Sequence, residues 1–146
     1  MILCDVNVFV YAHKQGAPRH ADWRAWLQNV LEADEPFGVS DLVLSSFLRV
    51  VTHPRIFDQP TPWTDARAFV AAVRSAENAT PISPGPRHWR IFLELADAAG
   101  ALGNALPDAY LAALAIESGS EWITVDRGFG RFPGLRWRHP LGEASA

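Results

Sequence analysis

The segment ILCDVNVFVYAHK, residues 2–14, gives the clearest indication of fold class in this 146-residue chain. Residues 2–4 are apolar and predict a short buried strand, and residues 7–14 predict a helix directly after it. Asp5 lies at the junction between them. A carboxylate at this position costs burial free energy unless it has a partner, so a functional role and a structural role both stay open.

The same alternation of strands and helices continues toward the C-terminus. Apolar residues at helical spacing predict helices over residues 18–34, from 41 to the region of 53, from a cap at Thr64 through 73, from 89 to a stop at Gly100, and over 107–119. Strands are predicted over residues 37–39, 80–83 and 121–126, with a short edge strand at 135–137 after the glycine-rich turn 128–134. This order implies an α/β fold, a three-layer α/β/α domain around a mainly parallel sheet.

The composition indicates one globular domain over residues 1–146, since 49% of the residues are hydrophobic and 20% are charged. Cys4 is the only cysteine, so an intrachain disulfide is excluded, and the cysteine and histidine spacings match no structural zinc site. A single cysteine suits a reducing compartment, so we expect a cytoplasmic protein. Asp5 interrupts the first apolar run and no apolar stretch reaches membrane-spanning length, so we expect neither a signal peptide nor a membrane-spanning segment.

Three aspartates occupy positions that a parallel sheet would bring together. Asp5 and Asp126 end predicted strands, and Asp108 begins a predicted helix. In open α/β sheets, ligands bind beyond the carboxyl ends of the strands, near the point where the strand order reverses. We therefore expect these three carboxylates to line one crevice although they are far apart in sequence.

Converging carboxylates repel one another unless a cation compensates, so this cluster suggests a divalent metal. Ligands that are all oxygen favour Mg²⁺, with Mn²⁺ as a substitute. Such an ion lowers the pKa of bound water and stabilises charge on a phosphoryl oxygen, which makes phosphodiester hydrolysis the simplest reaction for the set. Asn7 is expected to add a neutral hydrogen bond at the site.

The aspartates also have structural alternatives. A carboxylate in the first turn of a helix suits the helix dipole, so Asp108 taken alone is better explained as a cap than as a catalytic group. Asp126 is intermediate between Asp5 and Asp108 in this respect. Sequence position alone therefore leaves the roles of the three residues open.

Three segments carry a family resemblance: ILCDVNVFVYA at residues 2–12, ALPDAYLAALAIESG at 105–119 and WITVDRGFGRFPGLRW at 122–137. In order and spacing they resemble PIN-domain ribonucleases, specifically the VapC-type toxins of bacterial toxin-antitoxin pairs. The resemblance implies an Mg²⁺-dependent endoribonuclease that cuts structured RNA such as tRNA or ribosomal RNA. It assigns Asp5, Asp108 and Asp126 as the catalytic, metal-binding carboxylates, and it implies a cognate VapB-type antitoxin and a homodimer.

One position departs from the family pattern. VapC-type toxins commonly have a glutamate on the helix after the second strand, where this sequence has Ser46. The site therefore lacks one charge, which leaves the number of metal ions open. Ser46 could instead position a water molecule at the metal, and a Ser46→Glu change should tighten Mg²⁺ binding if this residue lines the site.

The same helix carries a polar stripe of Asp41, Ser45 and Arg49 at i, i+4, i+8 spacing. Two interpretations follow. Arg49 could bind a scissile phosphate, or Asp41 and Arg49 could form a structural network along the edge of the helix.

Arginines follow Asp126 in a stretch free of acidic residues, at Arg127, Arg131, Arg136 and Arg138. They predict a basic patch for RNA phosphates beside a metal ligand, with a solvated arginine surface as the structural alternative. The net charge of −3 argues against a protein that coats nucleic acid by bulk attraction.

Two other function classes fit parts of the same sequence. Asp5 as a phospho-aspartate nucleophile is disfavoured for two reasons. Asn7 stands where related phosphatases need a second aspartate, and such proteins need a lysine late in the chain, whereas Lys14 is the only lysine here. A degenerate PIN domain that binds RNA or antitoxin without cleavage stays open, since the glutamate is absent. The apolar faces of the early tryptophan-bearing helices are candidate surfaces for a second copy or the antitoxin.

Overall fold

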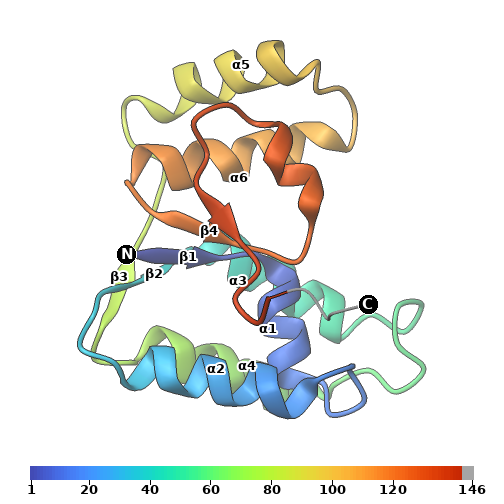
Figure 1. The fold of residues 1–146 in the computed structure, drawn as a ribbon. Helices are drawn as coiled ribbons and strands as arrows, with labels where there is room; N and C mark the ends of the chain where they lie inside the picture. The colour runs from blue at the N-terminus through green and yellow to red at the C-terminus, as the bar shows by residue number, and fades with distance from the viewer. Residues whose placement is uncertain (143–146) are drawn as a thin grey trace.

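The computed structural model describes residues 1–142, so the last four residues of the expected domain lie outside it. Its centre is one five-stranded sheet in the order β3-β2-β1-β4-β5 (Figure 1). All four strand pairs within residues 1–142 are parallel, in agreement with the predicted α/β class. The strands are β1 (Ile2–Cys4), β2 (Phe37–Val39), β3 (Ala79–Pro81), β4 (Glu121–Ile123) and β5 (Trp137–Arg138).

Helices cover both faces of this sheet, which confirms the three-layer arrangement. They are α1 (Val6–His13), α2 (His20–Glu32), α3 (Asp41–Val51), α4 (Trp63–Arg74), α5 (His88–Ala99) and α6 (Ala105–Glu117), with a short 3₁₀ helix η1 (Arg127–Arg131). In Figure 1, α5 and α6 lie on one side of the sheet and α1, α2 and α4 on the other, while α3 packs against α1 and α4. Among the described residues, none of these helices has both the length and the apolar character that a membrane span requires.

Aromatic residues fill the layer between the sheet and α1, α3 and α4. The Phe9 ring meets Phe37, Phe47 and Phe69 edge-on, and Phe47 stacks on Phe69 with ring centroids 4.8 Å apart. Phe37 and Phe47 are fully buried. This layer stabilises the sheet face from which β1 passes into α1.

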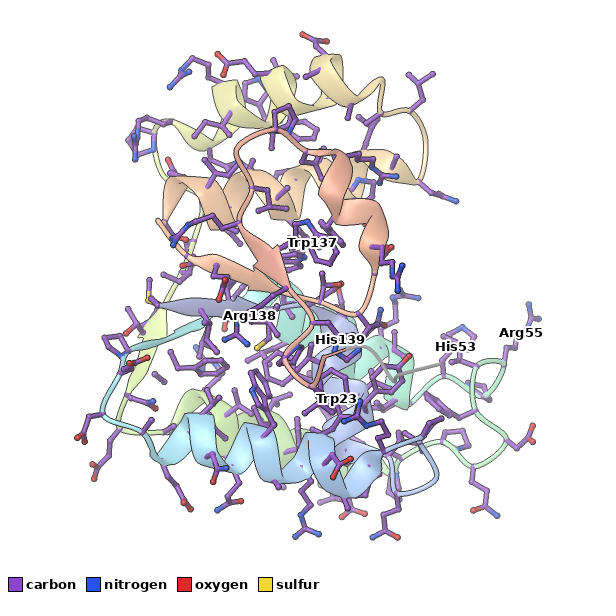
Figure 2. The ribbon with its side chains drawn as sticks, viewed as in Figure 1. Trp23, His53, Arg55, Trp137, Arg138 and His139 are labelled. Atoms are coloured by element: carbon purple, nitrogen blue, oxygen red, sulfur yellow. The ribbon has the colours of Figure 1, made fainter. Side chains whose placement is uncertain are left out.

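Among the early tryptophans, Trp23 of α2 is buried and does not contribute to an exposed apolar face. Its ring is 3% exposed and packs between Tyr11 and His139, so the C-terminal segment closes over α2 (Figure 2). Large exposed apolar side chains instead occur elsewhere, at Trp63, Trp89 and Leu93 among others. The exposed apolar surface of α5 is therefore the more accessible one.

Several predicted boundaries are corrected by local hydrogen bonding. The strand expected over 121–126 ends at Ile123, because the Thr124 hydroxyl accepts a hydrogen bond from the Asp126 N–H and turns the chain. The glycine-rich turn contains η1. Thr64 is not a cap, since the first turn of α4 closes on the Pro62 carbonyl.

The strand order places the carboxylates where the connections diverge. The chain leaves β1 for β2 on one side, while β4 pairs with β1 on the other side in the register Leu3↔Trp122. The switch point thus lies between the carboxyl ends of β1 and β4, the position where open α/β sheets bind ligands. Asp5 directly follows β1, and Asp126 lies three residues beyond β4.

Glu117, at the end of α6, caps a neighbouring helix. Its carboxylate accepts hydrogen bonds from the backbone N–H groups of Gly85 and Arg87, at 2.6 and 2.8 Å, just before α5 begins. Desolvation opposes the charge, but these two donors and the nearby His88 and Arg87 together lower the pKa of Glu117. A carboxylate at a helix N-terminus also interacts favourably with the helix dipole.

The Glu117→Gln variant is expected to lower the free energy of unfolding by about 1 kcal/mol, the usual cost of a lost helix cap. Because the folded pKa lies below 4.5, the ordinary pKa of a glutamate in the unfolded chain, the wild-type advantage is fully present above 4.5 and disappears as pH falls through the folded pKa. Urea unfolding at pH 7 and at acidic pH measures this difference. A difference of the same size at both pH values would contradict this account of the cap.

Candidate functional site

Asp5 is the most buried of the three predicted carboxylates, with 7% of its surface exposed. Its Oδ1 accepts a hydrogen bond from the Val6 N–H at 2.7 Å and so caps α1. Its Oδ2 accepts a hydrogen bond from the Thr124 hydroxyl, also at 2.7 Å. Burial raises the pKa of Asp5, the two hydrogen bonds oppose this, and the charges of Asp108 and Asp126 raise it further.

Thr124 joins two of the candidate residues, and sequence reasoning missed it. Its side chain is fully buried. The hydroxyl donates to Asp5 and accepts from the backbone N–H of Asp126 at 3.0 Å. The period of two along an extended chain, which puts Thr124 and Asp126 on the same side, is the signal that could have found it.

Asp108 lies in the first turn of α6, one residue after Pro107. The helix starts earlier than predicted, at Ala105, so Asp108 is not the capping residue itself. Its Oδ2 accepts a hydrogen bond from Arg131 Nη2 at 2.9 Å. Burial raises the pKa of Asp108, Arg131 acts in the opposite direction, and Asp126 raises it.

Asp126 caps η1. Its Oδ1 accepts a hydrogen bond from the Gly128 N–H at 2.8 Å. A Cβ atom on Gly128 would lie 2.9 Å from this same oxygen, so glycine permits the turn to close on the carboxylate. The side chain is exposed, and the turn fixes its position beside the switch point.

The three aspartates lie near enough to one another for their charges to affect each other's pKa. Asp108 and Asp126 both act on Asp5, and Asp126 acts on Asp108. Within residues 1–142, however, no three acidic, histidine or cysteine side chains are close enough to enclose a metal ion. Mg²⁺ is commonly held by one or two carboxylates and completed by water, so this open set of oxygen donors fits that ion.

An apolar groove is lined by residues that flank two of the carboxylates in sequence. It has a volume of about 450 Å³ and is lined by residues of α3, α5 and α6 together with Val6. Two of its lining residues, Val6 and Pro107, are next in sequence to Asp5 and Asp108. Ser46 lines the same groove, which places the position of the missing glutamate close to the candidate site.

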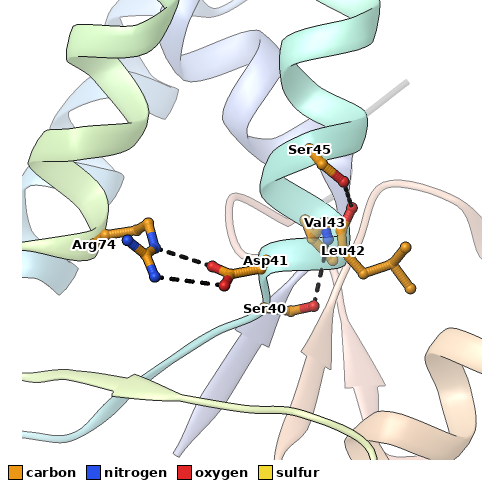
Figure 3. A network of polar contacts seen from close by, with 6 residues as sticks. All are labelled: Ser40, Asp41, Leu42, Val43, Ser45 and Arg74. Atoms are coloured by element: carbon orange, nitrogen blue, oxygen red, sulfur yellow. Dashed lines mark hydrogen bonds and ion pairs between the residues drawn. The ribbon is translucent and has the colours of Figure 1, made fainter.

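The proposed Asp41–Arg49 network is wrong. Asp41 instead accepts hydrogen bonds from Arg74 of α4, at 3.0 and 3.4 Å, and the Ser45 hydroxyl donates to the Leu42 carbonyl (Figure 3). Arg49 is exposed and, within residues 1–142, has no hydrogen-bond or ion-pair partner. Its guanidinium therefore stays available to an anion.

The four C-terminal arginines do not form one patch beside Asp126. Arg131 donates a hydrogen bond to Asp108. Arg136 instead donates to the carbonyl of Gly119, which lies just before the start of β4, away from Asp126. Arg138 pairs with Glu121 at 2.7 Å, and Glu121 is the first residue of β4. The predicted patch is thus corrected for Arg136 and Arg138, while Arg127 and Arg131 lie on η1 beside the carboxylates.

Comparisons with known proteins identify the family of the chain. The profile of the PIN domain family matches residues 2–135. Ribonuclease VapC43 of Mycobacterium tuberculosis is 48% identical over 141 residues, which cover 97% of this chain and 96% of that protein. Ribonuclease VapC25 of the same species is 45% identical over 140 residues, covering 96% and 99%.

Solved structures share the architecture. The structure of VapBC2 from Rickettsia felis, bound to a DNA fragment from its promoter, matches with a TM-score of 0.68 at 20% identity. The match covers 94% of this chain and 98% of that one, so the fold is the same. The molecule is a PIN domain. By its identity to the curated relatives, the chain belongs to the VapC family of PIN-domain ribonucleases.

Proposed function

We propose that this chain is an Mg²⁺-dependent endoribonuclease toxin of a toxin-antitoxin pair, acting on structured RNA such as tRNA or ribosomal RNA. The observation that carries the proposal is the set of electrostatically coupled carboxylates, Asp5, Asp108 and Asp126, at the switch point of the sheet. Both relatives are named ribonucleases, which supports RNA as the substrate.

The residues of the chain divide the work at this site. Asp5, Asp108 and Asp126 would hold the ion, and the hydrogen bond from Thr124 orients Asp5. When bound, Mg²⁺ lowers the pKa of water and stabilises charge on a phosphoryl oxygen. Arg49, Arg127 and Arg131 are the candidates for phosphate contacts, and Asn7, exposed on the first turn of α1, is the candidate for a neutral hydrogen bond.

Cleavage of total cellular RNA by the purified protein tests the function. Defined fragments are expected with Mg²⁺ or Mn²⁺, none with EDTA, and full recovery when the metal is restored. The serine at position 46, in place of the usual acidic residue, favours a second function, RNA or antitoxin binding without cleavage. RNA that stays intact with both metals, while the protein still binds it, would establish this second function.

A cognate VapB-type antitoxin is the protein partner that we propose. The groove is apolar, and two of its lining residues, Val6 and Pro107, are next in sequence to Asp5 and Asp108. A segment that combines an apolar side chain with a neighbouring basic one is therefore complementary to both parts. The fold match to the R. felis VapBC2 structure, bound to a fragment of promoter DNA, is consistent with such a partner.

A homodimer is expected through α5, where Trp89 and Leu93 are 63% and 45% exposed and lie one helical turn apart. The double variant Trp89→Asp, Leu93→Glu is expected to be monomeric, because it places charges on the proposed apolar contact. Light scattering coupled to size-exclusion chromatography measures the mass. A monomeric wild type, or a dimeric double variant, would contradict the use of this surface.

The Ser46→Glu variant is expected to bind Mg²⁺ roughly threefold to tenfold more tightly, because ligand charge raises the affinity of oxygen-ligand sites. Ser45→Glu is the matched control, since it adds the same charge one residue earlier, where the side chain is exposed. Calorimetric titration compares the two variants. Equal affinities would place Ser46 outside the metal environment.

A further inference from the structure

The guanidinium of Arg131 places a positive charge beside Asp108, a candidate metal ligand. Its Nη2 lies 2.9 Å from Asp108 Oδ2, and the Arg131 and Asp108 side chains are 39% and 32% exposed. The same guanidinium lies 4.9 Å from the centroid of the Phe132 ring. A divalent ion that binds Asp108 Oδ2 would therefore be repelled by the nearby charge of Arg131.

The turn that carries Arg131, η1, is held at both ends by candidate metal ligands. Asp126 caps η1 at one end, and five residues later Arg131 reaches Asp108. Gly130 lies against Trp137, since a Cβ atom there would be 3.3 Å from the indole ring. These contacts restrict the backbone, so η1 links one candidate ligand to another through a positively charged side chain.

We propose that Arg131 is a built-in competitor of the divalent cation for Asp108, and that it sets the metal concentration at which the site becomes occupied. The inference rests on the proposed metal-dependent function and deepens it. The Arg131–Asp108 contact neutralises Asp108 while the metal is absent. Occupation of Oδ2 by the metal requires this contact to break, because two cations cannot share the same lone pairs without repulsion.

Removal of the competitor changes metal affinity in a direction that a supporting residue would not produce. The contact is partly solvent-exposed, so the loss of Arg131 is expected to tighten binding by about two- to fivefold. A residue that merely positioned Asp108 for the metal would weaken binding when removed. The sign of the change therefore separates the two roles.

The test is calorimetric titration of Mn²⁺ into the full, EDTA-stripped chain, for wild type and Arg131→Gln. Arg74→Gln is the matched control, because it also breaks an Arg–Asp ion pair, the one with Asp41 (Figure 3). Neither Arg74 nor Asp41 is among the charges that shift the pKa of Asp5 or Asp108. Arg131→Lys, which keeps the charge but loses the planar fork, is expected to bind with an affinity between wild type and Arg131→Gln.

Tighter Mn²⁺ binding by Arg131→Gln, with wild-type affinity for Arg74→Gln, is the expected result. Unchanged or weaker binding by Arg131→Gln, while wild type binds, overturns the competition and leaves the metal-dependent function standing. Absence of Mn²⁺ binding by wild type and by Arg131→Gln alike overturns both. Metal affinity is read without RNA, so the result does not depend on activity.

Discussion

RNA cleavage by the Asp5→Asn variant is expected to fall by at least roughly 1,000-fold relative to wild type. Metal ions contribute several kcal/mol of charge stabilisation, and each 1.4 kcal/mol corresponds to a tenfold change in rate. Asparagine removes the negative charge but keeps an oxygen that can accept from the Val6 N–H. Gel analysis of total RNA with Mg²⁺ measures the loss.

The same variant has a built-in control for folding. Burial and the charges of Asp108 and Asp126 disfavour an ionised Asp5, so a neutral side chain there removes an unfavourable interaction. The metal-free variant is therefore expected to unfold at or above the wild-type temperature. Retained cleavage in a folded variant would remove Asp5 from the mechanism.

The Thr124→Val variant is expected to lose about 10- to 100-fold in metal affinity or activity, the usual effect of removing a group that orients a metal ligand. Valine has nearly the same shape but no hydroxyl. The Asp5 Oδ2 loses its donor and the Asp126 N–H loses its acceptor, so the free energy of unfolding should also fall by about 1–3 kcal/mol.

The pH dependence distinguishes this role from simple destabilisation. The Thr124 hydrogen bond lowers the pKa of Asp5, so its loss raises that pKa. The acidic limb of the cleavage profile is therefore expected to move to higher pH in Thr124→Val. Thr124→Ser, which keeps the hydroxyl, should retain the wild-type profile. Identical profiles for the valine and wild-type proteins would contradict the positioning role.

The fold was predictable because its signals are local. Residues 2–14 alone contain a buried strand, a junction carboxylate and a helix, and β1 and α1 occur within one residue of the expected places. Boundaries were less predictable where the chain bonds to itself through side chains or fixed dihedrals. Thr124 ends β4 early, and Pro62 rather than Thr64 begins α4.

The candidate site was predictable to a smaller extent. The parallel topology brings Asp5, Asp108 and Asp126 toward one another, as expected. The contacts of long side chains could not be read from spacing, since an arginine can reach in several directions. Arg131 turns toward Asp108, whereas Arg136 reaches the far end of β4. Pairing of Asp41 with Arg74 required the tertiary contact between α3 and α4.

The three carboxylates make the metal-free site energetically unfavourable. A buried Asp5 beside two other carboxylates is unfavourable for the metal-free fold, and the hydrogen bonds from Val6 and Thr124 offset only part of this cost. A divalent cation would offset the remainder. Such an arrangement is more easily explained by function than by stability.

Anomalous diffraction from crystals grown with Mn²⁺ tests the central claim most directly. A strong Mn²⁺ peak is expected between Asp5, Asp108 and Asp126. Absence of a peak in crystals soaked at high Mn²⁺ concentration, or a peak bound only to residues outside this cluster, would contradict a carboxylate-held metal at the switch point.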